Sequence, residues 1–266
     1  MSESLSTGRK PRIIAVANQK GGVGKTTTAI NLATAMAANM HRVLLIDLDP
    51  QGNASTSLGI GRKQREIGTY ELLMGEATLP EVVLNTIVPR MYLVPATVDL
   101  SGAEIELVDL DRREYRLRDA LSGTNAYDYI IIDCPPGLTL LMVNALVAAG
   151  GVLIPLQCEF LAMEGITHMT GTIDRVRKRF NPALELQGIV LTMFDRRNNL
   201  NNQVAEDVRD FFGDRVYKTT IPRNVRVSEA PSHGKPALIY DLRCSGSDAY
   251  VRLAAEILRR ERELAQ

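Results

Sequence analysis

The 266-residue sequence has no net charge. Lysine and arginine total 31, and aspartate and glutamate also total 31. A strong overall field that would draw the molecule onto nucleic acid or anionic lipid is therefore excluded. Any contact with DNA must come from a local patch of basic side chains.

Cysteine is also scarce. Cys134, Cys158 and Cys244 are widely spaced and include no C-x-x-C pair of the kind that binds zinc or an iron–sulfur cluster. This pattern favours a protein of the reducing cytoplasm.

Long apolar runs are missing as well. The longest apolar stretch, 140–156, is interrupted by asparagine, glycine and proline, so we predict a helix, a turn and a strand there rather than a membrane span. Residues 1–10 are polar and contain no apolar signal-peptide core. We expect them to form a flexible tail ahead of one domain over 11–266, because no repeat or linker divides the sequence.

Apolar runs of strand length alternate with stretches of helical spacing. Their hydrophobicity is continuous, which indicates that both faces of each strand are covered, as in a parallel sheet between helices. We therefore predict an α/β fold, a doubly wound and mostly parallel sheet with helices on both faces. The predicted strands are 12–18, 42–49, 127–135, 151–157 and 186–194, and the predicted helices are 25–39, 138–149, 163–180, 200–212 and 246–264. Between 55 and 125 the pattern is weak, with one strand-like run at 91–96.

A glycine-rich loop at 19–27 joins the first predicted strand to the first predicted helix. Glycines there let backbone N–H groups close around phosphate oxygens, and the helix dipole favours negative charge. We predict that the loop binds ATP with Mg²⁺, that Lys25 reaches the β- and γ-phosphates, and that the Thr26 hydroxyl binds the metal. The expected nucleotide-binding residues of the loop are Lys20, Gly21, Gly22, Val23, Gly24, Lys25, Thr26 and Thr27.

Aspartates stand at the carboxyl ends of two predicted strands, the edge where ligands bind in open α/β sheets. They are Asp47 and Asp49 in the first strand and Asp133 in the second. A magnesium ATPase needs a carboxylate near the metal and a group that positions the attacking water. A lone aspartate at a strand end is often only a cap or a turn former. The phosphate-binding loop in the same sequence favours the functional interpretation.

The loop departs from the general G-x-x-x-x-G-K-[ST] pattern, because Gln19 replaces the first glycine and Lys20 is an additional lysine. This K-G-G-x-G-K-T-T form resembles the deviant Walker-A family, which includes ParA, MinD, the nitrogenase iron protein and arsenical-pump ATPases. The resemblance implies that two subunits face each other across two ATP molecules. Lys20 would then act in trans and supply positive charge to phosphoryl transfer, as an arginine finger does.

The resemblance also implies roles for the three aspartates. Asp49, in a D-x-D-P-Q-x-N stretch, would orient the attacking water, and Asp47 would lie in the phosphate and magnesium surround. Asp133, in a stretch similar to a Walker-B motif, would hold magnesium through a water. The expected catalytic set is Lys20, Lys25 and Asp49. A carboxylate of ordinary acidity is a poor base for water, so we expect slow hydrolysis, which suits a switch.

Over roughly 12–260 the sequence is similar to the chromosome and plasmid partition ATPases called ParA or Soj. The similarity is carried by ANQKGGVGKTTTAINLATA at 17–35, LLIDLDPQGNAS at 44–55, IIDCPPGL at 131–138, PLQCEFLAMEGI at 155–166 and IPRNVRVSEAPSHGKP at 221–236. In this family a stretch like the last one lies near the adenine. The resemblance therefore implies that Pro222 and Asn224, together with Met193, contact the base. The open alternative is a rigid connecting loop, since proline and asparagine are common in loops.

The same resemblance implies non-specific DNA binding by the ATP-bound dimer. Arg197 and Arg226 match the family's DNA-contacting arginines, and Arg196, Arg223 and Lys235 would extend the patch. Contacts to backbone phosphates predict steep salt dependence and little sequence preference. The implied partners are DNA, a second copy of the chain and a ParB-like centromere-binding protein that stimulates hydrolysis. The implied location is cytoplasmic and nucleoid-associated, with no stable membrane association.

Two alternatives stay open. A MinD-like membrane switch would end in an amphipathic lipid-binding helix, but the last helix has Val251, Ala254, Ala255 and Leu258 on one stripe, which favours a core-packed helix. A metal-cluster carrier similar to the nitrogenase iron protein would need cysteines at a dimer axis, and only Cys134 stands near the site. The nature of the cargo, whether chromosome, plasmid or protein cluster, does not follow from the sequence.

Overall fold

A central sheet organises the structure, a computed structural model that describes residues 10–264. Its strands are β1 (Arg12–Val16), β2 (Val43–Asp47), β3 (Leu84–Asn85), β4 (Met91–Val94), β5 (Tyr129–Asp133), β6 (Gly151–Gln157), β7 (Glu185–Phe194) and β8 (Val216–Pro222). Their order is β3-β4-β2-β5-β1-β6-β7-β8. The pairing of β3 with β4 is antiparallel and the other pairings are parallel. Of the tail expected over 1–10, residues 1–9 lie outside the described part.

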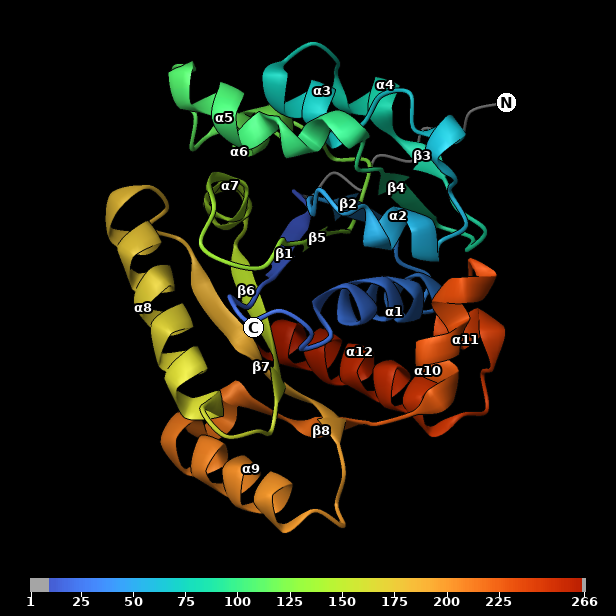
Figure 1. The fold of residues 1–266 in the computed structure, drawn as a ribbon, viewed down its shortest axis with the longest axis vertical. Helices are drawn as coiled ribbons and strands as arrows, with labels where there is room; N and C mark the ends of the chain where they lie inside the picture. Colours follow the sequence, from blue (N-terminus) through green and yellow to red (C-terminus); the bar gives the residue numbers. More distant parts are fainter. Residues whose placement is uncertain (1–9, 265–266) are drawn as a thin grey trace.

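Helices cover both faces of the sheet (Figure 1). They are α1 (Lys25–Ala38), α2 (Asn53–Ser57), α3 (Thr69–Met74), α4 (Leu79–Val82), α5 (Ala103–Glu106), α6 (Arg116–Ala120), α7 (Leu140–Ala148), α8 (Ala162–Arg179), α9 (Asn199–Phe212), α10 (Val225–Glu229), α11 (Ala237–Tyr240) and α12 (Ser245–Leu264). Short 3-10 turns η1 (Arg62–Gln64), η2 (Val98–Ser101), η3 (Leu107–Asp109), η4 (Gly213–Arg215) and η5 (Ala230–His233) connect them. The predicted doubly wound α/β fold is confirmed.

Alternate side chains of the central strands enter two separate apolar cores. In β1, Ile14 and Val16 pack with α1 and α12, whereas Ala15 packs with α7 and α8 on the other face. Figure 1 shows α8 and α12 on opposite sides of the sheet. The continuous hydrophobicity of the strands thus reflects burial of both faces.

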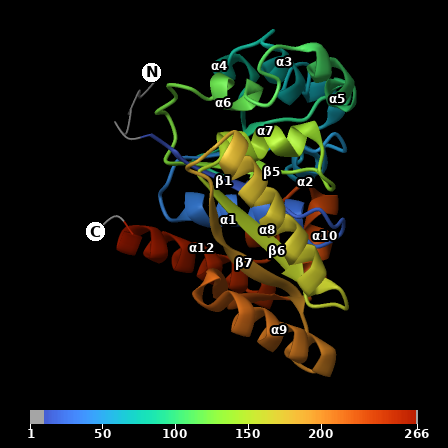
Figure 2. The ribbon, with the colours of Figure 1, turned by 90° about the vertical axis from the view of Figure 1, so that its left-hand side faces the viewer.

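The five predicted strands and the five predicted long helices are all present, and the run at 91–96 contains β4. The weak pattern between 55 and 125 corresponds to short elements, of which the longest helix, α3, has six residues. Helices α3 to α6 gather at one end of the molecule and α9 lies at the other end (Figure 2). Strand β8 was not among the predicted strands.

The last helix, α12, packs in the core as predicted, but its buried stripe differs from the predicted one. Ala254 and Leu258 are buried, whereas Val251 and Ala255 are exposed. Leu253 and Ile257, which directly precede Ala254 and Leu258, belong to the buried stripe instead. The stripe was wrong by one residue in part because alanine and valine fit either face of an amphipathic helix.

Candidate functional site

The phosphate-binding loop leaves β1 and enters α1 within a few residues. Gly22 and Gly24 have φ values of +75° and +86°, a conformation that glycine adopts without steric cost. The Thr192 hydroxyl, near the end of β7, donates a 2.8 Å hydrogen bond to the Val23 carbonyl. The loop is therefore fixed against β7 and ends at Lys25, the first residue of α1. A helix N-terminus in this position stabilises an anion.

Lys25 lies largely buried beneath this loop. Its Nζ donates a 3.0 Å hydrogen bond to the Lys20 carbonyl. Burial lowers the pKa of Lys25, and the Asp133 and Asp49 carboxylates oppose that shift. The ammonium group thus faces the carboxylates at the strand ends, where it is available to phosphate oxygens.

Lys20, the additional lysine, has a different partner. Its Nζ lies 2.8 Å from Oε2 of Glu159, in an ion pair whose side chains are about half exposed. Glu159 belongs to the connection between β6 and α8. The charge of Lys20 is therefore balanced by an acid of its own subunit.

Asp47 and Asp133 lie opposite each other on the neighbouring strands β2 and β5. Both residues are fully buried. Neither carboxylate oxygen of Asp133 has a hydrogen-bond partner, and Oδ1 of Asp47 also lacks one. Burial raises the pKa of Asp47 to about 6. Burial, and then the proximity of Asp47, raises the pKa of Asp133 well above its usual value.

Buried oxygens without partners mark a place where a cation fits. The Thr26 side chain lies close to the Asp133 carboxylate but makes no hydrogen bond of good geometry to it, and Thr26 and the Lys25 charge both oppose the raised pKa of Asp133. Within residues 10–264 no group of three or more His, Cys, Asp or Glu side chains could hold a metal alone. Mg²⁺ commonly takes one or two carboxylates, several waters and substrate phosphates. Thr26 and Asp133 therefore fit a magnesium ion that is shared with a nucleotide.

Asp47 also has a structural bond. Its Oδ2 accepts hydrogen bonds from the backbone N–H and the hydroxyl of Ser55, at 2.8 and 2.6 Å. These bonds close the turn that carries Asp49. Asp49 is 7% exposed, and its Oδ1 accepts a 3.0 Å bond from the Gln51 N–H. The structure therefore places all three predicted aspartates at one edge of the sheet, with Asp47 holding the turn.

The predicted adenine contacts come from neighbouring strand ends, since Phe194 pairs with Pro222. Met193 has a φ of +48°, and its methyl group lies next to Gly24 of the phosphate-binding loop. Asn224 caps α10, because its Oδ1 accepts from the Arg226 N–H at 2.8 Å. The amide of Asn224 is thus already used within the protein, as expected of a structured loop.

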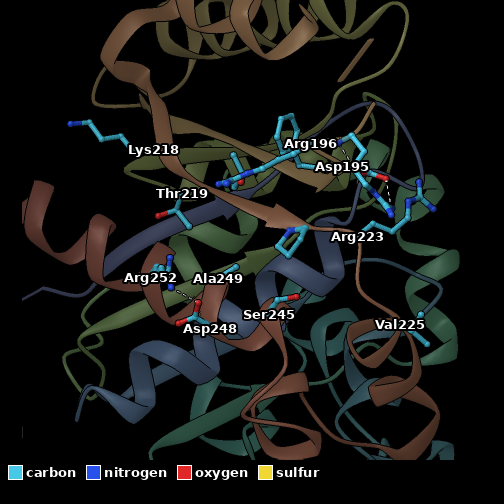
Figure 3. A pocket seen from close by; sticks show the side chains of 14 residues that line it. Asp195, Arg196, Lys218, Thr219, Arg223, Val225, Ser245, Asp248, Ala249 and Arg252 are labelled. Atoms are coloured by element: carbon cyan, nitrogen blue, oxygen red, sulfur yellow. Dashed lines mark hydrogen bonds and ion pairs between the residues drawn. The ribbon is translucent and has the colours of Figure 1, made fainter. Parts of the chain in front are cut away.

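A pocket of about 820 Å³ opens beside these strand ends (Figure 3). This volume is in the range of small-molecule sites. Apolar and basic side chains share its wall. They include Phe194, Pro222, Val225 and Ala249, and the basic residues Arg196, Arg197, Lys218, Arg223 and Arg252.

The two predicted DNA-contacting arginines are exposed, and each is paired with an acid. The Arg197 side chain is 91% exposed, and its Nη2 lies 2.9 Å from Oδ2 of Asp195. Nη1 of Arg226 lies 3.0 Å from Oε2 of Glu229. Hydrogen bonds from Arg197 lower the pKa of Asp195 to about 2.

The rest of the predicted basic patch is divided between two places. Arg196 and Arg223 line the same pocket as Arg197. Arg226 lies on α10, and the exposed Lys235 follows η5. The structure therefore brings three of the five basic residues around one pocket.

Cys134 follows Asp133 and is fully buried. Burial raises the pKa of its thiol. A buried neutral thiol packs as a small apolar group, whereas the metal-cluster alternative needs a cysteine exposed at a dimer axis.

Glu159, Ser55 and Thr192 were not among the site residues predicted from the sequence. Each acts through a partner distant in sequence, such as Glu159 on Lys20. A weak signal existed for Ser55, since it stands within the stretch that follows Asp49. Glu159 stands within PLQCEFLAMEGI at 155–166, another stretch that carries the family resemblance, whereas Thr192 lies in none of these stretches.

This chain is similar to known proteins. A family model described as an AAA domain matches residues 11–186. The chain is 61% identical over 255 residues to the chromosome partitioning protein ParA of Caulobacter vibrioides, covering 95% of this chain and 96% of the relative. It is 51% identical to the sporulation initiation inhibitor protein Soj of Bacillus subtilis, covering 92% and 98%. The chain belongs to the ParA/Soj family of ATPases.

The ParA/Soj resemblance predicted from the sequence is thereby confirmed. A solved structure of cobyrinic acid a,c-diamide synthase from Mycobacterium smegmatis, with bound ATP analogue and magnesium, is 38% identical. It has a TM-score of 0.83 and covers 95% of this chain and 96% of its own. In the ParA/Soj chain, no helix within residues 10–264 is long and apolar enough to cross a membrane.

Proposed function

We propose that this chain is an ATP-dependent dimeric switch that binds DNA non-specifically and segregates chromosome or plasmid DNA. The buried Asp133 carboxylate, which has no hydrogen-bond partner and faces Lys25, is the observation that carries the proposal. Such a carboxylate is costly in the ligand-free protein and is stabilised when a cation arrives with a nucleotide. The relatives named for chromosome partitioning support the proposed role in DNA segregation.

The nucleotide would lie along the start of α1. Backbone N–H groups of 20–27 and the Lys25 ammonium would bind the phosphates. Thr26 would hold magnesium directly, and Asp133 would hold it through a water. Magnesium, when bound, neutralises phosphate charge and polarises the reacting phosphoryl group. Met193, Pro222 and Asn224 would frame the base beside the pocket of Figure 3.

Hydrolysis would depend on Asp49 and on Lys20. Asp49 lies on the turn fixed by Asp47 and Ser55, and it would orient the attacking water. Lys20 would reach the phosphates of the partner subunit, which requires it to leave Glu159. Slow turnover then follows, because the catalytic set is complete only in the dimer. A ParB-like partner would accelerate it.

DNA would bind to the basic surface around Arg197 and Arg226. Both side chains are exposed, and an exposed arginine exchanges an acid partner for a phosphate at low cost. Dimerisation would double the surface and place the ATP-bound protein on the nucleoid.

DNA binding tests the proposal first. Wild-type protein is measured with ATP, with ADP and without nucleotide, on two unrelated duplexes at two salt concentrations. We expect binding only with ATP, equal on both duplexes and weakened by salt. Binding that ignores nucleotide or salt would contradict the proposal, and liposome pelleting would then test the MinD-like alternative.

Asp49→Ala tests the hydrolytic role. We expect ATP binding to persist, turnover to fall about 100-fold, and the dimer to accumulate in size-exclusion chromatography with light scattering. Gln51→Ala is the matched control, because it keeps the backbone N–H that binds Asp49. Normal turnover by Asp49→Ala would show that another group positions the water.

A further inference from the structure

Asparagines at the start of α9 organise the loop that carries Arg197. Asn198 caps the helix, since its Oδ1 accepts from the Leu200 N–H at 2.9 Å. The Asn202 side chain donates a 2.9 Å hydrogen bond to the Arg196 carbonyl. Asn202 thus bonds within the loop and its own helix. Asn201 differs, because its amide joins this loop to another one.

Both ends of the Asn201 amide are bonded. Its Nδ2 donates a 2.7 Å hydrogen bond to the Cys158 carbonyl, 43 residues away. Its Oδ1 accepts a 3.1 Å bond from the backbone N–H of Asp195. Asn201 lies in the first turn of α9, and Cys158 lies in the connection between β6 and α8. Asn201 is therefore a bridge between two loops.

Each of those loops holds a side chain of the proposed switch. On one side, Cys158 directly precedes Glu159, whose carboxylate binds Lys20. On the other side, the Asp195 carboxylate accepts bonds from Nε and Nη2 of Arg197, at 3.0 and 2.9 Å. A continuous series of bonds thus runs from the lysine of the phosphate-binding loop to the arginine of the basic surface.

The β6–α8 connection has the features of a segment that rearranges. Leu161 has a φ of +71°, which is strained for a leucine. Phe160 and Leu161 are 78% and 60% exposed, although both are large and apolar. A segment with strain and few buried contacts opens at low cost. Loss of the Lys20 contact removes one of the bonds that hold it.

We propose that Asn201 couples the loop that binds Lys20 to the loop that carries Arg197, so that nucleotide-driven release of Lys20 changes how Arg197 is presented to DNA. The inference rests on the proposed function for its trigger, the movement of Lys20 toward a partner's nucleotide. Asn201 acts as a positioning residue.

Hydrogen exchange of the full-length protein tests the coupling without DNA. Exchange is followed in 20–27, 157–161 and 194–204, with and without a non-hydrolysable ATP analogue and Mg²⁺. In wild type we expect the nucleotide to change exchange in all three segments. In Asn201→Ala we expect changes in 20–27 and 157–161 only.

Two further variants separate coupling from simple loosening. Asn201→Asp keeps an acceptor for the Asp195 N–H but loses the donor to the Cys158 carbonyl, so it should also lose the response of 194–204. Asn202→Ala removes the bond to Arg196 only, so its exchange at 194–204 should rise with and without nucleotide while the response is kept. A merely structural role would make the three variants alike.

DNA affinity provides a second readout. The gain in affinity caused by ATP should fall about two- to ten-fold in Asn201→Ala and Asn201→Asp, the range of one side-chain hydrogen bond, and stay at the wild-type value in Asn202→Ala.

The outcomes distinguish the inference from the proposed function. A nucleotide response of 194–204 that persists in Asn201→Ala, or is missing in wild type that responds at 20–27, overturns the coupling. No response at 20–27 in wild type refutes nucleotide binding and the coupling with it. A wild-type response at 194–204 that Asn201→Ala abolishes, without DNA binding, supports the coupling and refutes the DNA function.

Discussion

The strand-end carboxylates and the basic surface balance their charges in opposite ways. Asp133 is buried, and neither of its carboxylate oxygens has a hydrogen-bond partner. Arg197 and Arg226 are exposed, and each has an acid within 3.0 Å. The buried carboxylate therefore lacks a partner within the protein, whereas each of the two exposed arginines already has an acid partner.

This difference indicates what each region is built to bind. A buried unpaired carboxylate destabilises the protein until a cation reaches it, so the strand ends favour a ligand that is bound for long periods. Exposed ion pairs contribute little to stability, so a polyanion displaces them easily and reversibly. The first region suits a nucleotide with its metal, and the second suits transient DNA contacts.

Lys25→Ala should have the largest effect, and it should act on the buried nucleotide site. Lys25 is a largely buried cation that faces Asp133. Its replacement removes a positive charge from beside the nucleotide phosphates and the Asp133 carboxylate. We expect nucleotide affinity to fall at least about 100-fold, measured by titration calorimetry. Lys20→Ala is the comparison, and as a monomer it should bind nucleotide within about three-fold of wild type, because Lys20 binds Glu159 of its own subunit and would reach phosphates only across the dimer. Equal losses in both variants would contradict the separation of the two lysines.

Arg226→Glu should weaken DNA binding by the exposed basic surface. The variant repels backbone phosphate, so we expect DNA affinity with ATP to fall about ten-fold or more and the salt dependence to become shallower. ATP binding and dimerisation should be unchanged. The control is Arg259→Glu, which removes an exposed arginine from a pair with Glu263 on α12. A similar loss of DNA affinity in the control would show that only overall charge matters.

The buried carboxylates also predict a pH dependence of stability. Their pKa values are raised in the folded protein, to about 6 for Asp47 and higher for Asp133. Folded protein therefore holds protons that the unfolded chain has released, and stability from this source is lost as pH rises above about 4, through about 6 for Asp47 and beyond that for Asp133. We expect a loss of about 1 to 3 kcal/mol without ligand, measured by urea unfolding.

Asp133→Asn should remove most of that pH dependence and stabilise the ligand-free protein at pH 8, because the amide carries no charge to bury. Asp174→Asn, an exposed acid paired with Arg177, should leave it unchanged. If Asp133→Asn unfolds with the same pH dependence as wild type, the buried carboxylate does not carry the effect.

The contrast between the buried strand ends and the exposed surface also explains which parts of the structure could be predicted from the sequence. The strand order places Asp47 beside Asp133 because two continuous apolar runs form neighbouring parallel strands, and periodicity detects such runs. Strand β8 escaped prediction because it is an edge strand of mixed character, in which Tyr217 is buried and Lys218 is exposed. Burial does not alternate strictly along VYKTTIP, so neither the continuous nor the alternating strand pattern detects it.

The contacts that join distant loops could not be predicted. Glu159 meets Lys20 across 139 residues, and Asn201 meets the Cys158 carbonyl across 43. These contacts depend on how two loops pack against each other, and no local pattern encodes that. The candidate side chains were therefore predicted from the sequence, whereas the groups that restrain them were not.

Asp195→Asn should sharpen the comparison with the smallest effect. The amide no longer neutralises Arg197, while the Asp195 backbone N–H still bonds to Asn201. We expect DNA affinity with ATP to rise about three-fold at low salt and the gain to vanish at high salt, measured by fluorescence anisotropy. Asp248→Asn is the matched control, because Asp248 pairs with Arg252 at 2.7 Å in the wall of the same pocket. A gain in both variants would mean that the pocket responds to net charge, and a gain only in Asp195→Asn would mean that its carboxylate restrains the arginine that meets DNA.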